Sequence, residues 1–298
     1  MSTSFKNRVY GAVVIKSINS NYNADFSGQP RKLPNGVVYA TDKALKYSIR
    51  NYWKNALGES VFYFKSFNDN LAPKDLKETY EAKYKDIKND KVEVLGNLLE
   101  NIDVRLFGGT FAVKSMNLSL HGTCQITHGV NKFSENVIYS EQILSPFRNS
   151  NKDDADNSTL GSQSRLEEGH YVHHFSINPK NIEEDAARVK SAGVLVEDIT
   201  KLKDGLCKGA TYYDSAAKSG TENELMIWVE LKEGAKIVLP SFVNLIDIND
   251  KREIDLSKLQ ALLKEEHLAK EIAKIELYYN KIFTKVINEP ANAVVLPI

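Results

Sequence analysis

The sequence predicts an α+β fold in which the elements follow the order β-α-β-β-α-β, the order of ferredoxin-like and RRM-like domains, with large insertions. Three observations lead to this prediction. A β-branched run at 9–18 is typical of a buried strand, and an amphipathic helix follows it. Residues 117–127 alternate apolar and polar side chains, as a half-exposed strand does. A helical pattern at 196–207 precedes the apolar strand 224–231. No linker divides the chain, so we expect a single domain over residues 1–298.

The first strand is followed by a long loop at 19–36 that is rich in Asn, Gly and Pro. Thr41 or Asp42 is placed to cap the next helix, and Gly58 is placed to end it. The apolar positions of this helix recur at helical spacing, so we expect them to pack on the sheet. They are Leu45, Ile49, Tyr52 and Ala56.

The middle of the chain carries the predicted insertions. We expect a strand at 61–67, a helix that begins at Pro73 and a further helical piece at 92–99. Residues 101–133 then read as an antiparallel meander, with strands at 102–104 and 110–113. The Phe-Gly-Gly sequence between these two strands predicts a tight turn, because it lacks the lysine and the following helix of a phosphate-binding loop.

The second half of the chain begins with a polar segment. Residues 145–169 contain few apolar side chains and many Asp, Asn and Ser, which is typical of a flexible arm, and we place this arm at 145–170. A strand is expected at 172–177, and a long helical region at 255–287.

The charge is unevenly distributed. The chain balances 39 basic against 39 acidic residues, yet residues 1–58 hold nine basic residues and only Asp25 and Asp42 as acids. This segment therefore carries +7 and the rest of the chain carries −7. A basic segment on an acidic body indicates a surface for a polyanion and a second surface that could meet a basic neighbour. The alternative is chance clustering of solvated charges.

The sequence gives no sign of a membrane or an export route. No apolar run approaches the roughly 18 residues that span a bilayer, and the N-terminus has no apolar signal core. Cys124 and Cys207 are far apart in sequence, and we expect free thiols rather than a disulfide. These features favour a cytoplasmic protein.

The basic positions of the first helix form a stripe opposite its apolar face. Lys43, Lys46, Arg50 and Lys54 fall at i, i+3, i+7 and i+11. Cations along one helical face are able to follow the phosphates of a nucleic acid. The preceding loop adds two cations and three amide donors, namely Arg31, Lys32, Asn19, Asn21 and Asn23. The alternative is an ordinary amphipathic helix whose cations are solvated.

Two other groups of residues could carry chemistry. His170, His173 and His174 have the spacing of a helical metal site, but the segment reads as a strand, where ligands at i and i+2 share a face. We therefore expect no metal there, and a stacking or hydrogen-bonding role in a nucleic-acid groove remains open. Asp25 and the cluster Asp153, Asp154 and Asp156 are candidate catalytic acids without a partner at recognisable spacing.

Several stretches together resemble the backbone subunit of type I CRISPR Cascade complexes, with the I-B branch closest in pattern. They are VYGAVVIKSINSNYNADFSGQPR, TDKALKYSIRNYW, FGGTFA, HGTCQITHG, ILSPFRN and ENELMIWVELKEGAKIVLP. The resemblance runs over most of the chain and lies in the order of the segments. It implies a non-catalytic scaffold with a ferredoxin-like palm and finger and thumb insertions. The arm at 145–170 falls where a thumb would reach the next copy.

The resemblance also implies partners and contact residues. Copies of such a subunit polymerise head to tail along one guide crRNA, beside other Cascade subunits, and present the guide to target DNA without a cofactor. The positions that match the family's guide contacts are Asn23, Arg31, Thr41, Lys43, Lys46 and Arg50, and we add Asn21 as a donor in the same loop. Related type III subunits cut target RNA with a loop aspartate, and Asp25 is the position to compare.

The sequence leaves three functions open. The first is the guide-RNA scaffold. The second is a metal-dependent ribonuclease that uses Asp25 or the histidines at 170–174. The third is a module that binds an acidic partner other than nucleic acid.

Overall fold

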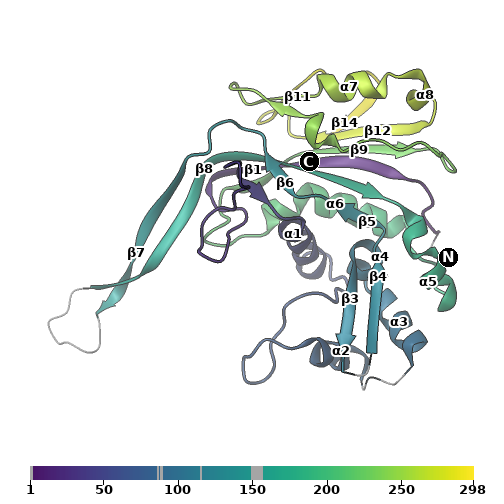
Figure 1. Ribbon diagram of the computed structural model, residues 1–298, viewed down its shortest axis with the longest axis horizontal. Coiled ribbons are helices and arrows are strands. Elements are labelled where there is room, and N and C mark those ends of the chain that lie inside the picture. The colour runs from purple at the N-terminus through teal and green to yellow at the C-terminus, as the bar shows by residue number, and fades with distance from the viewer. Residues whose placement is uncertain (1–2, 86, 88–89, 115, 149–156) are drawn as a thin grey trace.

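The computed structural model describes residues 3–85, 87, 90–114, 116–148 and 157–298, and it is a mixed α+β fold, as predicted (Figure 1). The strands of its main sheet are β1 (Val9–Ser20), β2 (Tyr39–Ala40), β5 (Cys124–Ile126), β6 (Gly129–Asn131), β7 (Ile138–Arg148), β8 (Asn157–Ile177), β9 (Thr221–Leu231), β12 (Ile272–Tyr279) and β14 (Ala293–Leu296). Strand β1 is central and pairs antiparallel with β8 on one side and β9 on the other. The sheet continues from β9 to β12 and β14, and from β8 to β6 and β2.

One face of this sheet is covered by two helices, α1 (Asp42–Asn55) and α6 (Val196–Tyr212). The predicted apolar face of α1 is confirmed, since Leu45, Ile49 and Tyr52 are buried. The helices lie close together because α6 carries Gly209, where an added Cβ would lie 3.2 Å from the backbone nitrogen of Ile49. The remaining predicted position, Ala56, lies beyond the last residue of α1 and is exposed.

The opposite face of the sheet is covered by a C-terminal layer. Its elements are η2 (Phe242–Asn244), β10 (Asp247–Ile248), β11 (Glu253–Asp255), α7 (Ser257–Leu263), α8 (Glu266–Ala269) and β13 (Lys285–Ile287). Tyr10 and Val172 of the sheet share a hydrophobic core with Phe242 and Leu259 of this layer. RNA-recognition modules use the sheet face for RNA, but in this chain that face is filled by the protein's own side chains.

A lower lobe, residues 60–122, hangs below the helical layer in Figure 1. Its elements are α2 (Leu76–Tyr84), α3 (Lys91–Leu99), α4 (Ile102–Phe107), β3 (Gly108–Val113) and β4 (Met116–His121). It has a hydrophobic core of its own, in which Phe62, Tyr80, Val94 and Phe111 are buried. Arg105 joins the lobe to the helical layer through Asp198 of α6, with an Nη2–Oδ1 distance of 2.7 Å.

Strands β7 and β8 form a hairpin that projects from the sheet (Figure 1). The inner part of β8, from Leu166 to Ile177, pairs with β1, while its outer part pairs with β7. The predicted arm at 145–170 falls on this hairpin, although residues 149–156 lie outside the described part. The strand predicted at 172–177 begins earlier than expected, and positions 166–170 lie within the sheet.

Between β8 and α6 the chain forms the short helices η1 (Pro179–Ile182) and α5 (Glu183–Arg188). Four local predictions are wrong. The Phe-Gly-Gly sequence forms no turn between two strands, because Phe107 ends helix α4 and the two glycines begin strand β3. Residues 61–67 form no strand, because Phe62 is drawn into the core of the lower lobe and its N–H donates to Asp103. The expected strand at 102–104 is part of helix α4. The region 255–287 is not one long helix but contains α7, α8, β12 and β13, and β12 buries Ile275, Leu277 and Tyr279 at the two-residue period of a strand.

Both cysteines are free and buried, as predicted. In the described part of the chain, no helix combines the length and hydropathy that a bilayer crossing requires.

Candidate nucleic-acid interface

The start of α1 is tied to the loop that precedes it. Thr41 is the N-cap residue, but its side chain makes no capping hydrogen bond. Its backbone N–H and its hydroxyl both donate to Asn23 Oδ1, at 2.9 and 3.0 Å. The two predicted contact residues therefore hold each other and fix the loop on the helix.

The loop is also fixed to the base of the hairpin. Asn21 is buried, and its Nδ2 donates to the carbonyl oxygens of Gly28 and Ser164 at 3.0 and 3.1 Å. Gln29 Nε2 donates to Ser164 Oγ at 2.6 Å. On the other side, Lys218 Nζ donates to the carbonyl oxygen of Tyr22 at 2.8 Å. Asn21 thus acts within the protein as a link between loop and hairpin.

The cations of the predicted stripe divide into two kinds. Lys46 is only 11% exposed, and its Nζ lies 3.2 Å from Asp42 Oδ2. Arg50 is 15% exposed, and its Nε donates to Asp103 Oδ2 at 3.0 Å. Asp103 is fully buried and also accepts the backbone N–H groups of Phe62 and Tyr63. The expectation that the whole stripe faces outward is therefore wrong for Lys46 and Arg50.

The other cations of the loop and of α1 remain open to solvent. Lys32 and Lys43 are exposed, and neither has an ion pair among the described residues. Lys54 is exposed and its Nζ lies 4.5 Å above the ring of Phe64. Arg31 is half-buried, with its guanidinium 6.0 Å from the ring centroid of Phe26. These four side chains are placed to meet an external anion.

The sequence interpretation missed an aromatic component of this surface. Tyr47 stacks on Phe64 at 5.3 Å and meets Tyr213 edge-on at 5.1 Å. The sequence does indicate Tyr47, because position 47 lies on the same helical face as the basic positions 43, 50 and 54. Phe64 and Tyr213 come from distant segments, and no sequence pattern places them there.

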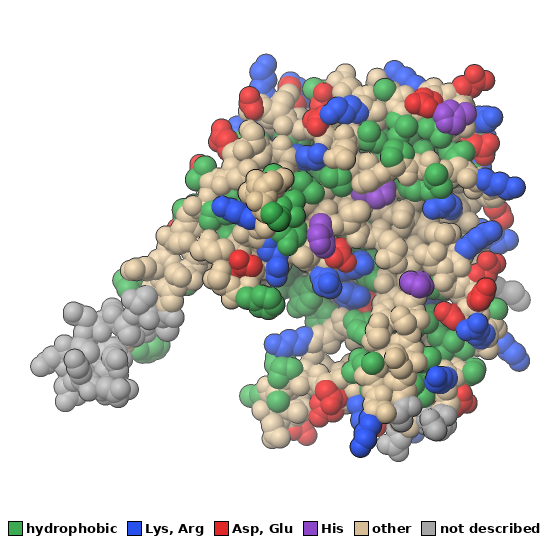
Figure 2. All heavy atoms as spheres, in the orientation of Figure 1, with side chains coloured by type: hydrophobic (Ala, Val, Ile, Leu, Met, Phe, Trp, Pro, Cys, Tyr) green, Lys and Arg blue, Asp and Glu red, His purple; other side chains and the backbone are tan. Residues whose placement is uncertain are grey.

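The exposed cations of α1 and its loop lie near a recess of the surface. Figure 2 shows the surface hollowed between the hairpin and the lower lobe, with Lys and Arg side chains gathered at the head of the recess, over α1. Figure 2 also shows Asp and Glu side chains beside these cations, so the attraction for a polyanion comes from the individual exposed cations rather than from a surface of one sign.

Comparisons with known proteins identify the family. The family model for the CRISPR-associated protein Cas7 matches residues 7–276. The chain belongs to the Cas7 family. A solved structure titled "CRISPR RNA-guided surveillance complex, pre-nicking" is similar with a TM-score of 0.61 and 11% identity, over 98% of this chain and 96% of that one. Another, titled "CRISPR RNA-guided surveillance complex", has a TM-score of 0.54 and 13% identity, over 96% of each chain. No curated protein matches the sequence. The resemblance drawn from the sequence is confirmed for the family; these matches do not specify subtype I-B.

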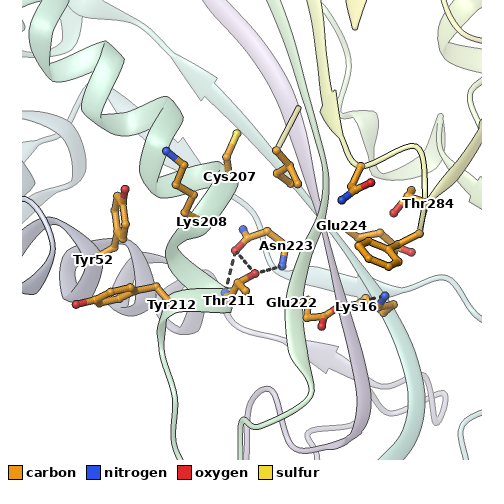
Figure 3. Close-up of a pocket in the computed structure, with 13 residues that line it drawn as sticks. Lys16, Tyr52, Cys207, Lys208, Thr211, Tyr212, Glu222, Asn223, Glu224 and Thr284 are labelled. Carbon is orange, nitrogen blue, oxygen red and sulfur yellow. Dashed lines mark hydrogen bonds and ion pairs between the residues drawn. The ribbon is translucent and has the colours of Figure 1, made fainter. Parts of the chain in front are cut away.

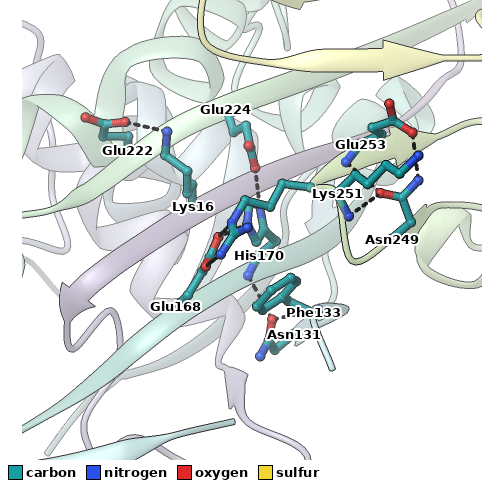
Figure 4. Close-up of polar contacts among 11 residues, drawn as sticks. Lys16, Asn131, Phe133, Glu168, His170, Glu222, Glu224, Asn249, Lys251 and Glu253 are labelled. Carbon is teal, nitrogen blue, oxygen red and sulfur yellow. Dashed lines mark hydrogen bonds and ion pairs between the residues drawn. The ribbon is translucent and has the colours of Figure 1, made fainter. Parts of the chain in front are cut away.

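The three clustered histidines, His170, His173 and His174, hold the sheet to its neighbours in this Cas7-family chain. His170 Nδ1 lies 2.5 Å from Glu224 Oε2, and Glu168 accepts two hydrogen bonds from Arg252 in the same network (Figure 4). Burial lowers the pKa of His170, but its hydrogen bonds to Glu224 and Glu168 outweigh that effect and raise it.

His173 and His174 are buried in their neutral form. His173 lies between the hydroxyl of Tyr22 and the carbonyl oxygen of Thr127, at 3.2 and 3.0 Å. Burial lowers the pKa of His173 and of His174 to about 4. Within the described residues, no group of three His, Cys, Asp or Glu side chains is arranged to hold a metal ion. A role for these histidines in an open nucleic-acid groove does not fit their burial.

Asp25 is a turn residue. Its Oδ1 accepts hydrogen bonds from Ser27 Oγ, Ser27 N–H and Gln29 N–H, at 2.7, 2.8 and 3.0 Å. These bonds, the one from Ser27 Oγ above all, lower its pKa, although the carboxylate is solvent-accessible. A carboxylate fixed in this way organises the loop. The other candidate acids, Asp153, Asp154 and Asp156, lie outside the described residues.

A cleft of about 440 Å³ lies between α6, β9 and the segment around Thr284 (Figure 3). Two of its polar lining residues are engaged with each other, since Asn223 Oδ1 accepts from the N–H and the hydroxyl of Thr211. Burial raises the pKa of the Cys207 thiol to about 12, so this cysteine is not a thiolate nucleophile at neutral pH.

Proposed function

We propose that this Cas7-family chain is a non-catalytic backbone subunit of a type I Cascade complex, of the I-B branch, which holds a guide crRNA by its phosphates. Copies arranged head to tail, together with other Cascade subunits, would present the guide to target DNA in the cytoplasm. Family membership and the titles of the similar structures support the proposal. In RNA-guided recognition, base pairing reads the sequence, so the protein needs to grip only the backbone.

The observation that carries the proposal is the set of exposed cations on an immobilised surface. Lys32, Lys43 and Lys54 have no ion pair among the described residues, while Arg31 is near enough to Asp25 for its charge to lower the pKa of that carboxyl. Arg31, Lys32 and Lys43 border the loop, which is held by both α1 and the hairpin, and Lys54 lies in the last turn of α1. In this proposal Arg31 and Lys43 contact phosphate, as the resemblance implies. Lys46 and Arg50 keep α1 and the lower lobe in place around the RNA.

The other contact residues that the sequence predicted hold this surface in place. Asn23 and Thr41 join the loop to α1, and Asn21 joins it to the hairpin. The Asn23 and Thr41 groups that bond each other are 2.9 to 3.0 Å apart, so a nucleic acid would meet a loop whose shape is already set.

We further propose that the core is the ferredoxin-like palm of one domain, residues 1–298. The spatial order β9-β1-β8-β6 with antiparallel neighbours, and α1 and α6 on one face, supports this topology. The lower lobe would be the finger insertion, and the hairpin with the arm at 145–170 would be the thumb. Ile143 and Leu144 on the hairpin are exposed apolar side chains, which suits a thumb that packs on a neighbouring copy.

The test is the salt dependence of RNA binding. Each phosphate contact to a single strand contributes about 0.7 to the slope of log K against log salt. The double substitution Lys32→Ala, Lys43→Ala should lower this slope by about 1.4 and weaken all RNA sequences equally. Lys236→Ala, Lys251→Ala is the matched control, because both lysines are exposed and follow β9, towards the C-terminal layer. Equal slopes for the two double variants would contradict the proposed interface.

The non-catalytic assignment has its own test. Purified protein is incubated with guide and complementary RNA in magnesium or manganese, and the RNA is examined on a denaturing gel. We expect intact RNA with the wild type and with Asp25→Ala. Cleavage that disappears in Asp25→Ala would favour the ribonuclease instead.

A further inference from the structure

The loop between β1 and β2 presents an aromatic side chain entirely to solvent. Phe26 has a relative exposure of 104%, which no other large hydrophobic residue of the described chain reaches. The Arg31 guanidinium lies 6.0 Å from its ring centroid, and Lys32 follows in the sequence. A fully hydrated phenyl ring beside cations has no role in the protein core.

The turn that carries Phe26 is nevertheless rigidly built. The residue before it, Asp25, accepts three hydrogen bonds from Ser27 and Gln29, and Gly28 takes the positive φ of +81° that closes the turn. Gln29 then donates to Ser164 of β8. A ring held on a fixed turn loses little conformational freedom when a planar partner stacks on it.

The usual stacking surface of this type of sheet is not available. RNA-recognition modules stack bases on aromatic side chains of the central strands. Here the corresponding face carries Tyr10 and His174, which lie against each other with ring centroids 6.3 Å apart, and His174 also contacts Phe242 of the C-terminal layer. Any stacking contact with a base must therefore come from outside the sheet.

We propose that Phe26, with Arg31 beside it, is a stacking platform for one unpaired nucleobase of single-stranded RNA held at the recess. This inference rests on the proposed function and adds a base contact to its phosphate contacts. Stacking on a phenyl ring accepts any base, because every base has a π-face. Arg31 strengthens the platform, since a guanidinium binds both the ring and a phosphate. The platform therefore orders a base without selecting the guide sequence.

The experiment compares RNA with an abasic ribose-phosphate strand of equal length. Stacking on an aromatic side chain contributes about 5- to 150-fold per base. Phe26→Ala should weaken binding of RNA within that range and leave binding of the abasic strand unchanged. Because Phe26 makes no core contact, the variant should keep the thermal midpoint of the wild type. Leu71→Ala, an 82% exposed apolar residue of the lower lobe, is the matched control and should bind both strands as the wild type does.

A second variant reports the contact directly. The only native tryptophans, Trp53 and Trp228, are fully buried, so Phe26→Trp introduces the single exposed indole. Its red-shifted emission should be quenched by RNA and not by the abasic strand, with affinity for RNA retained.

Three outcomes would overturn the platform. In the first, Phe26→Ala loses affinity equally for RNA and for the abasic strand, and in the second it loses affinity for neither. In the third, Phe26→Ala keeps its affinity for RNA but changes the sedimentation of the protein without RNA, which would assign Phe26 to a contact between copies. A wild type that binds no RNA at low salt would overturn the proposed function itself, so the two failures are distinguishable.

Discussion

We expect the replacement of Arg50 to lower the stability of the fold rather than to remove a direct contact with RNA. Its Nε is bonded to Asp103, a fully buried carboxylate that also accepts the N–H groups of Phe62 and Tyr63. Arg50→Ala would leave this carboxylate with two backbone donors and without its hydrogen-bonded cation, so that the nearby Lys83 remains as its counter-charge. Removing one partner of a buried ion pair costs about 3–5 kcal/mol. The two remaining backbone donors reduce this cost, so we expect about 2–3 kcal/mol.

The assay is thermal and urea unfolding of the full chain. For a protein of this size, 1 kcal/mol corresponds to about 2 °C, so Arg50→Ala should lower Tm by about 5 °C. Lys43→Ala on the same helix should shift Tm by less than about 1 °C, because an exposed side chain without an ion pair contributes little. The lower lobe should also become more sensitive to protease, since the pair of Asp103 and Arg50 connects it to α1 beside the stacking of Trp53 on Phe107.

A double-mutant cycle tests the mechanism. Asp103→Ala is combined with Arg50→Ala, and the coupling energy should be about 1–3 kcal/mol for two side chains in direct contact. If Arg50→Ala unfolds at the wild-type temperature, or if the cycle gives no coupling, the pairing does not carry the stability that we assign to it.

Three further predictions concern the core. The pKa of His173 and of His174 is about 4 in the folded state and about 6.5 in the unfolded state, so the folded state binds fewer protons and the stabilisation from both residues is present above pH 6.5 and lost as the pH falls. The free energy of unfolding from urea titrations should therefore be lower at pH 5 than at pH 7 by about 2 kcal/mol for each histidine. An equal free energy of unfolding at the two pH values would contradict this prediction. The pKa of His170 is raised, so the stability that His170 contributes has the opposite pH dependence and is lost as the pH rises through its folded-state pKa. Glu224→Gln should lower the pKa of His170 in an NMR titration. An unchanged pKa would exclude the pair with Glu224 as the cause. Gly108→Ala should lower the free energy of unfolding by more than about 2 kcal/mol, because φ is +66° and a Cβ would lie 2.2 Å from the carbonyl oxygen of Leu120. Gly36→Ala should lower it by only about 1 kcal/mol in the same assay, because φ is +84° but a Cβ would enter open space. Equal losses for the two variants would contradict the steric argument.

The sequence predicted those elements whose burial follows one simple period. Helix α1 buries Leu45 and Ile49 at helical spacing, and β1 is a continuous apolar run because both faces of the sheet are covered. The region 255–287 misled the interpretation because isolated Leu and Ile residues fit either period. Ile282, taken as part of a helix, is 84% exposed in the turn after β12.

The candidate site was predictable only in part, for a related reason. The pair Asp42 and Lys46 is spaced i and i+4 on a helix, so sequence alone could have indicated that Lys46 is engaged. The partner of Arg50 is 53 positions away and belongs to an insertion, and nothing local indicates it. Phe26 carries no periodic signal either, because a loop has no face against which its exposure could be predicted.

The excess of +7 in residues 1–58 overstates the charge that a polyanion would meet. Four of the nine cations have carboxylate partners within the chain, at Glu222, Glu233, Asp42 and Asp103. Of the other five, Arg8 lies at the start of β1 over the ring of Tyr10. The remaining four are Arg31, Lys32, Lys43 and Lys54, all on α1 or its loop. At about 0.7 per phosphate contact, they limit this surface to a salt slope of about 3 per copy. A polymer of copies along one RNA would therefore bind through many modest contacts, each of which leaves the base edges free to pair.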